Sequence, residues 1–398
     1  MESAVVRTEK SPETHSPTSN GTTNFPRLTL LYSCDPESEK MGGAVGYMQF
    51  LLEETQKRGL PVRFIGVELL STPRDYPFIP IQKKSDSWQK FLVKLFLRAP
   101  FLKFVRGEIV HVFRIAYAFP ILLFHRQVKV VCVSAEPLAA AAHRYPHWLF
   151  KIIDYLFWHV ERFVLKRLKA LCTTPDVLSR YFFSRHPALM KTVLVHPSTA
   201  VGIDLQQFTV LERIPIREKY NFTPDQKIML FVGRLAPVKR VDFLLKVFKQ
   251  LHEKEQVSHF IIVGDGEERE RLQRITEKEG IPAVHFWGEV SKTKLPEVYN
   301  LADVLVLASE TEGNPTVVRE ALACGLPVVS TAVGDVPEIL DNPYCGAVVP
   351  SRDVSDFQEA IAKVLALPRE KVNSVCRKKA MDFSREALFE ELVRLYNS

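Results

Sequence analysis

Residues 303–330 read DVLVLASETEGNPTVVREALACGLPVVS, and this succession of elements decides the fold. Val304–Ala308 is a short apolar run of the kind that forms a buried parallel strand. A polar loop then leads to Pro315, and an Asn–Pro pair signals the start of a helix. We expect a helix from Thr316 to Cys324, ended by Gly325 in a left-handed cap and followed by a second strand.

This order of strand, loop and helix directs free backbone amides past the carboxyl end of a parallel sheet. Unpaired amides at a helix N-terminus, together with the helix dipole, favour a bound anion such as a phosphate. The amides of the loop and the first helical turn therefore predict an anion site. It consists of Gly313, Asn314, Pro315, Thr316 and Val317.

Two carboxylates flank this predicted site. Glu312 lies in the loop and Glu320 about one turn into the helix, so both can face the same crevice. Carboxylates are poor ligands for phosphate but good acceptors for sugar hydroxyls. The alternative is an acidic loop residue and an unrelated, solvated helical Glu. The Glu–x7–Glu spacing around EGNP, followed by EALACGLPVV, favours the paired interpretation.

With this pair of glutamates the sequence resembles glycosyltransferase family 4, the retaining nucleotide-sugar glycosyltransferases of GT-B fold. The resemblance implies that Glu312 contacts the donor sugar and that Glu320 contacts the ribose hydroxyls of the nucleotide. It also implies an α/β protein of GT-B architecture, in which two Rossmann-like parallel-sheet domains face a cleft. The donor is then expected on the second domain and the acceptor on the first.

Two basic residues follow an earlier predicted strand, Ile228–Val232. Arg234 and Lys239 both lie in the loop that follows this strand. The forked guanidinium of Arg234 and the ammonium of Lys239 can therefore reach one anion. The alternative is a pair of solvated loop cations. The resemblance implies that both bind the donor diphosphate and stabilise the leaving group, with Arg240 where relatives have Gly. It also implies that the backbone of the loop ending at Val290 holds the nucleobase.

No metal ion or other cofactor is predicted. Asp265, Glu267 and Glu268 could be mistaken for a metal cluster, but acids in a first helical turn are explained by the helix dipole. The sequence contains no Asp–x–Asp motif that would indicate a metal–diphosphate site.

The chain of 398 residues is longer than one compact domain usually is, so two domains are expected. Residues 1–24 are rich in Ser, Thr, Pro and Glu and are expected to be a disordered tail. Residues 25–205 are the predicted acceptor domain and residues 206–380 the predicted nucleotide-sugar domain. In proteins of GT-B fold the closing helix, here in residues 381–398, commonly packs back on the first domain.

The first domain alternates apolar runs with helical periodicity, which indicates a parallel sheet. Gly43 ends a polar loop before a predicted helix, and the resemblance implies that this loop faces the donor diphosphate across the cleft. The loop lacks the GxGxxG spacing of a dinucleotide-binding site, so a dehydrogenase is disfavoured.

Residues 83–106 contain seven basic residues and one acidic residue, most of the net charge of +7. Within them, Trp88–Arg98 has apolar residues at helical spacing opposite a basic stripe, as in helices that lie on anionic membranes. The alternative is a helix packed on its own sheet with a solvated basic face. Charge concentrated in one amphipathic segment argues against a nucleic-acid partner.

Composition is that of an ordinary globular protein, with 46% hydrophobic and 25% charged residues. The six Cys form no CxxC pair, which favours a reducing compartment. The first residues lack the apolar core of a signal peptide, and the longest apolar region, Ile109–Phe124, is too short and polar to span a bilayer. We expect a cytoplasmic protein, with peripheral contact to the cytoplasmic face of a membrane if the amphipathic helix binds lipid.

The expected activity is transfer of a sugar from a nucleoside diphosphate to the hydroxyl of an unknown acceptor, which is a glycan, a lipid or a small molecule. One alternative is a nucleotide-sugar epimerase, which needs no acceptor. Another is a catalytically silent homologue that acts as a partner protein. The silent homologue is considered because the sequence has Ser134–Glu136 where members of the family usually carry a histidine.

Overall fold

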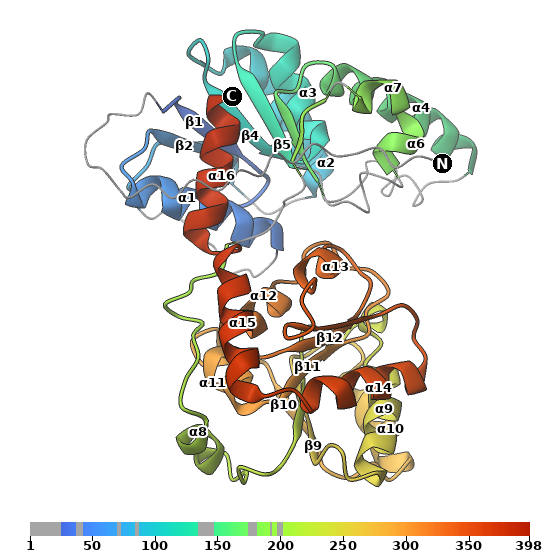
Figure 1. Cartoon of the computed structure of the whole chain (residues 1–398). Helices are drawn as coiled ribbons and strands as arrows, with labels where there is room; N and C mark the ends of the chain where they lie inside the picture. The colour runs from blue at the N-terminus through green and yellow to red at the C-terminus, as the bar shows by residue number, and fades with distance from the viewer. Residues whose placement is uncertain are drawn as a thin grey trace.

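The computed structural model describes residues 25–36, 43–69, 73–83, 87–133, 147–173, 181–191, 193–196 and 202–398. The predicted tail at 1–24, the polar loop before Gly43, and Ser134–Glu136 lie outside the described residues. The described residues form two α/β domains, which lie one above the other in Figure 1. Each domain is built on a parallel sheet, as the sequence predicts.

The first domain contains a seven-stranded sheet in the order β3-β2-β1-β4-β5-β6-β7. Every pair of neighbouring strands is parallel. The strands are β1 (Leu28–Leu31), β2 (Val62–Val67), β3 (Phe78–Gln82), β4 (Ile109–Phe113), β5 (Lys129–Val133), β6 (Ala170–Cys172) and β7 (Val195–His196).

Successive residues of a strand point to opposite faces, so this sheet separates two apolar cores. Val110 and Val112 belong to the core beneath α2, α3 and α4, whereas Leu28 and Leu30 belong to the core beneath α1. The helices of this domain are α1 (Gly43–Lys57), α2 (Trp88–Arg98), α3 (Ile115–Phe124), α4 (His147–Leu165), α6 (Phe183–Arg185) and α7 (Pro187–Met190), with a 3-10 turn, η1 (Ala99–Phe101). No described helix combines the length and the apolarity needed to cross a bilayer.

The second domain contains a six-stranded parallel sheet in the order β10-β9-β8-β11-β12-β13. Its strands are β8 (Ile228–Val232), β9 (His259–Val263), β10 (Val284–Gly288), β11 (Val304–Leu307), β12 (Val328–Thr331) and β13 (Gly346–Val349). Its helices are α8 (Arg213–Lys219), η4 (Pro237–Lys239, a 3-10 turn), α9 (Val241–Glu253), α10 (Arg269–Lys278), α11 (Leu295–Leu301), α12 (Thr316–Ala323), α13 (Val336–Ile339), α14 (Val354–Leu365) and α15 (Arg369–Met381).

The chain passes between the domains twice. After α15 it enters α16 (Arg385–Asn397), which rises from the second domain to the first in Figure 1. At the crossing, the amide of Ile203 donates to the carbonyl of Phe383 at 2.9 Å, and the amide of Arg385 donates to the carbonyl of Ile203 at 3.1 Å. The two connections are therefore bonded to each other.

Helix α16 completes the core of the first domain. Its Phe389 is fully buried and lies edge-on to Phe50 of α1, with ring centroids 6.5 Å apart. The hydroxyl of Tyr396 lies 2.7 Å from Nδ1 of His111, a buried residue of β4. Arg385 also forms ion pairs with Glu53 and with Glu54 of α1. The last helix in sequence thus belongs to the first domain in space.

Candidate functional site

The order of strands in the second sheet determines where a ligand is expected. From β8 the chain moves outward to β9 and β10, and it then returns to lay β11, β12 and β13 on the other side of β8. Strands β8 and β11 are therefore neighbours at which the direction of winding reverses. In open α/β sheets, ligands bind outside the carboxyl ends of the strands at such a reversal. The loops after β8 and β11 carry most of the site residues predicted from the sequence.

The loop after β11 leads into α12 as predicted. The helix begins at Thr316 as predicted and ends at Ala323, one residue before the predicted end, and Gly325 adopts the expected left-handed conformation with a φ of 70°. Pro315 is the N-cap residue and offers no side-chain hydrogen bond to the first turn. The first amides of a helix have no partner inside it, so the amides at the start of α12 are available to a ligand.

Glu312 and Lys239 meet across the strand reversal. The Nζ of Lys239, which comes from the loop after β8, donates a hydrogen bond to Oε1 of Glu312 in the loop after β11. The same oxygen accepts a hydrogen bond from Ser309 Oγ at 2.7 Å. Both side chains are mostly buried, which strengthens an ion pair relative to one in water. Two predicted donor-binding residues are therefore in direct contact.

Arg234 contacts a different acid. Its Nη2 lies 3.0 Å from Glu267 Oε2, and its side chain is 73% exposed. The structure thus places Arg234 and Lys239 on the same loop but does not bring their charges onto one partner. Exposure leaves the guanidinium able to change partner, since an exposed ion pair contributes little stability.

Arg240 occupies the position at which the family resemblance implies a Gly, and its φ of 51° lies in the left-handed region. Non-glycine residues rarely adopt this conformation, which costs about 1–2 kcal/mol. The guanidinium contacts Asp242 at 3.2 Å and Glu310 at 2.9 Å, and both contacts hold the loop after β8 against its surroundings. The substitution therefore keeps the backbone shape that a Gly would give.

Glu320 is buried, so it is not the solvated helical Glu of the alternative interpretation. It is 8% exposed, and its Oε2 accepts a hydrogen bond of 2.7 Å from the hydroxyl of Tyr299 in α11. Burial raises the pKa of Glu320, an effect that the hydrogen bond from Tyr299 partly offsets. Burial and the neighbouring Glu320 likewise raise the pKa of Tyr299. A buried carboxylate with one donor is a strong acceptor for a further hydroxyl.

A buried ion pair supports the loop after β11. Arg319 is 1% exposed and donates to Asp335 and, at 3.4 Å, to Oδ1 of Asn314. Beside this pair, Gly334 has a φ of 56°, and a Cβ on it would lie 2.3 Å from the carbonyl oxygen of Gly313. The loop after β12 therefore lies directly against the loop that carries Glu312.

These supporting residues were not predicted. Tyr299 and Asp335 come from segments far from their partners in sequence, and no local pattern links them. The one available signal was Arg319 itself, because a charged residue whose neighbours one helical turn on, Leu322 and Ala323, are apolar needs a buried partner.

Of the remaining predicted residues, Gly43 lies at the edge of a described range and Val290 lies within the second domain. Gly43 is the first residue of α1. Val290 lies two residues after β10 and packs, partly buried, on the core of the second domain. The acids expected in a first helical turn precede the helix, because α10 begins at Arg269. Instead, Asp265, Glu267 and Glu268 pair with Arg269, Arg234 and Arg271, respectively. Among the described residues, no group of three His, Cys, Asp or Glu is placed to hold a metal ion.

Comparison with known proteins gives consistent results for sequence and fold. Residues 212–383 match the family described as glycosyl transferases group 1. A D-inositol 3-phosphate glycosyltransferase of Mycolicibacterium smegmatis is 30% identical over 240 residues, 60% of this chain and 54% of the relative. One from Geodermatophilus obscurus is 33% identical over 249 residues, again 60% and 54%. The chain thus spans about half the length of these relatives.

Solved structures resemble both domains together. Sucrose-phosphate synthase from Thermosynechococcus elongatus has a TM-score of 0.73 at 21% identity, over 94% of this chain and 98% of its own. HepE of Anabaena, solved in complex with UDP, has a TM-score of 0.67 at 14% identity, over 92% and 98%. These similarities establish the two-domain GT-B fold. Residues 212–383, which make up most of the second domain, match the glycosyl transferases group 1 family.

Proposed function

We propose that this protein is a glycosyltransferase that moves a sugar from a nucleoside diphosphate sugar to an acceptor hydroxyl, with retention at the anomeric carbon. The observation that carries the proposal is the contact between Lys239 and Glu312 at the strand reversal of a domain that matches the group 1 family. In the transfer, the bond between anomeric carbon and diphosphate oxygen breaks, and a bond to the acceptor oxygen forms. The acceptor proton leaves with the diphosphate or to water.

Each site residue has a role that follows from its surroundings. Lys239, Arg234 and the backbone amides at positions 313, 314, 316 and 317 would stabilise the charge that develops on the departing diphosphate. Glu320 would accept hydrogen bonds from the ribose hydroxyls, and Glu312 would contact the donor sugar. Before the donor binds, the ion pair with Glu312 keeps Lys239 in the site. This assignment requires no metal ion, in keeping with a sequence that lacks an Asp–x–Asp motif.

Similar folds support a nucleotide-sugar donor. HepE of Anabaena has been solved in complex with UDP and with UDP-glucose, and its fold matches both domains of this chain. The curated relatives named above are glycosyltransferases. We therefore propose a uridine diphosphate sugar as the first donor to test.

A labelled-donor assay tests the activity. The protein is incubated with labelled uridine, guanosine or adenosine diphosphate sugars, with and without a membrane lipid extract or a sugar acceptor, and all products are separated. The proposal predicts nucleoside diphosphate release with label on an acceptor or, slowly, on water. Conversion of the donor to an epimer without an acceptor would show an epimerase instead. No turnover of any donor, or full turnover by Glu312→Ala, would contradict the assigned role.

We further propose that the first domain contacts an anionic membrane through residues 83–106. Helix α2 packs on its sheet through Phe91 and Leu95, yet Val93 and Leu97 are 60% and 66% exposed. Phe101, in the turn that follows, is 83% exposed. The alternative of a packed helix with only a polar outer face does not account for these apolar side chains.

An apolar groove continues from this exposed face. It has a volume of about 310 Å³ and lies between α2, α3 and α4. Its lining residues are Leu92, Val93, Phe96, Leu97, Ala116, Phe119, Phe157 and Val160. Exposed apolar surface beside a segment of charge +6 matches an anionic bilayer, whose headgroups attract the charge while its acyl chains receive the apolar side chains.

Vesicle co-sedimentation tests this contact. Wild-type protein is expected to sediment with vesicles that contain anionic phosphatidylglycerol, and weakly or not at all with neutral phosphatidylcholine. Leu97→Ser together with Phe101→Ser should abolish sedimentation without loss of folding, because both side chains are exposed. Met381→Ser, at an apolar position on the second domain that is 55% exposed, is the control. Equal binding by the double variant and the wild type would contradict the contact.

A further inference from the structure

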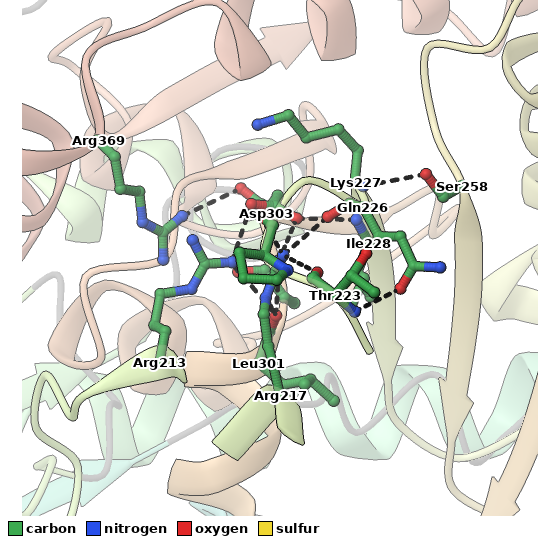
Figure 2. A network of polar contacts seen from close by, with 12 residues as sticks. Arg213, Arg217, Thr223, Gln226, Lys227, Ile228, Ser258, Leu301, Asp303 and Arg369 are labelled. Atoms are coloured by element: carbon green, nitrogen blue, oxygen red, sulfur yellow. Dashed lines mark hydrogen bonds and ion pairs between the residues drawn. The ribbon is translucent and has the colours of Figure 1, made fainter. Parts of the chain in front are cut away.

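A second cluster of charge lies at the other end of the second sheet. Asp303 immediately precedes β11, so it lies at the amino ends of the strands, opposite the loops proposed to bind the donor. Figure 2 shows Arg213, Arg217 and Arg369 arranged around this single acid. The cluster therefore carries an excess of positive charge that the proposed transfer does not use.

The carboxylate of Asp303 accepts hydrogen bonds from two of the arginines and from one backbone amide. Its Oδ1 accepts from Arg213 at 2.9 Å, and its Oδ2 accepts from Arg217 at 2.7 Å and from the amide of Ile228 at 2.8 Å. Burial alone would raise the pKa of Asp303, but the two positive charges outweigh it and lower the pKa. Among the described residues, no hydrogen bond joins this carboxylate to Arg369.

Arg213 and Arg217 also have a structural role. Arg213 donates to the carbonyls of Asn300 at 2.9 Å and Ala302 at 2.9 Å, and Arg217 donates to that of Leu301 at 3.1 Å. These are the orphan carbonyls at the end of α11, where positive charge also complements the helix dipole. Stability of the fold is enough to explain these two residues.

Arg369 has no such explanation. Among the described residues, its side chain makes one hydrogen bond, and that bond is long, 3.4 Å from Nη1 to the backbone oxygen of Asp303. Its Nε is buried without a partner among the described residues. Burial, followed by the positive charge of Arg213, lowers the pKa of Arg369 to about 10. A guanidinium in this position is destabilised unless an anion joins it.

A small cavity lies beside Arg369. Its volume is about 60 Å³, several times the roughly 10–15 Å³ that one water needs, and too small for a nucleotide. Arg213, Lys227, Asp303 and Arg369 are its polar lining residues. Lys227 is exposed at this position, and no contact joins its Nζ to another residue drawn in Figure 2. Arg369 is also the first residue of α15, whose N-cap residue, Pro368, offers no side-chain cap.

We propose that this cavity is a binding site for a small oxyanion of the phosphate class. Arg369 and Lys227 would donate to the oxyanion from two sides, Arg213 would add positive charge, and the first amides of α15 would complete the site. The site is separate from the proposed donor loops, because it lies at the opposite ends of the same strands. Its existence therefore does not depend on the proposed transferase activity.

The melting temperature of the full chain, titrated with inorganic phosphate at constant ionic strength, tests this site. A ligand that binds only the folded state raises the melting temperature in a saturable manner. We expect a saturable rise for the wild type. For Arg369→Gln the half-saturating phosphate concentration should increase about tenfold or more, the effect of losing a charged hydrogen bond. Lys227→Gln, at an exposed position, should weaken the response without affecting folding.

Lys239→Ala is the matched control, since it removes a cation from the donor loops and should leave the phosphate response of the cavity intact. Arg369→Gln should melt no lower than the wild type in phosphate-free buffer, whereas a purely structural Arg369 would lower the melting temperature there. The proposal is overturned if the wild type shows no saturable rise, or if only Lys239→Ala loses it. It is equally overturned if Arg369→Gln and Lys227→Gln keep the wild-type half-saturating concentration. Should Arg369→Gln fail to fold, Lys227→Gln alone decides.

Discussion

The carboxylate of Glu320 lies buried in the second domain and accepts one hydrogen bond, from Tyr299. Its pKa in the folded protein is raised above the ordinary value of 4.5, chiefly by burial. As the pH rises above 4.5, the unfolded chain loses its proton first, so stability falls and remains lower at neutral pH. A neutral Gln should remove this penalty but also remove a strong acceptor for a ribose hydroxyl.

We therefore expect Glu320→Gln to stabilise the free protein at pH 7 by on the order of 1 kcal/mol and to leave its stability at pH 4 nearly unchanged. The same variant should bind the donor about tenfold more weakly or worse. Thermal melts at several pH values and donor titrations measure the two effects. Glu277→Gln, an exposed helical position, is the control. A variant that is destabilised at pH 7, or that binds donor normally, would contradict the assigned role.

The contact between Lys239 and Glu312 makes a second prediction at this scale. Each of Lys239→Ala and Glu312→Gln should lower kcat/KM for the donor about a hundredfold or more, since each removes a group assigned to the transition state. Because the two side chains touch, their effects should not multiply. We expect the kcat/KM of the double variant to lie within about threefold of that of the less active single variant. Strictly multiplicative losses would show that the residues act independently.

Sequence reasoning identified the candidate site residues better than the residues that support them. Glu312, Glu320 and Lys239 stand in local patterns with a recognisable spacing. Tyr299 and Asp335 do not, because their importance comes from partners brought close only by the fold. A buried hydrogen bond between distant segments leaves no periodicity in either segment.

At the scale of elements, the loop after β12 holds the loop after β11 in place. We expect Gly334→Ala to be destabilising by more than the roughly 1–2 kcal/mol of a left-handed alanine, because its Cβ would meet the carbonyl oxygen of Gly313 at 2.3 Å. It should also weaken donor binding, since Gly313 belongs to the predicted anion site. Denaturant titrations and donor titrations measure both.

Gly280→Ala is the matched control. Gly280 has a nearly identical φ of 58°, but nothing lies within 4 Å of its added Cβ. It should therefore show only the conformational cost and bind donor as the wild type does. Equal behaviour of the two variants would mean that contact between the two loops has no part in the site.

The strands and helices with clean periodicity were predicted closely. Trp88–Arg98 and Ile228–Val232 coincide with α2 and β8. Several elements that contain a proline were missed, among them β3 with Pro80 and α3 with Pro120. β3 is an edge strand, where Pro is tolerated, and α3 is apolar on all sides because it packs between α2 and α4. Tertiary packing overrides the local signal in both.

At the scale of the whole molecule, the last helix stabilises the domain that the chain leaves first. Phe389→Ala should destabilise the protein by about 3–5 kcal/mol, the usual cost of removing a fully buried Phe. Hydrogen exchange should increase in α1, which contains Phe50, more than in the second sheet. Glu390→Ala, an exposed neighbour on α16, should change neither. Faster exchange confined to the second domain would contradict this placement of α16.

We propose that the loops after β8 and β11 hold a nucleoside diphosphate sugar. Isothermal titration of the wild type and Lys239→Ala with uridine, guanosine and adenosine diphosphate sugars tests it most directly. We predict one-to-one binding of at least one donor, with a Kd between about 1 μM and 1 mM, the usual range of KM values. Lys239→Ala should weaken this binding about tenfold or more. No binding of any donor at millimolar concentration, or unchanged binding by Lys239→Ala, would contradict the claim.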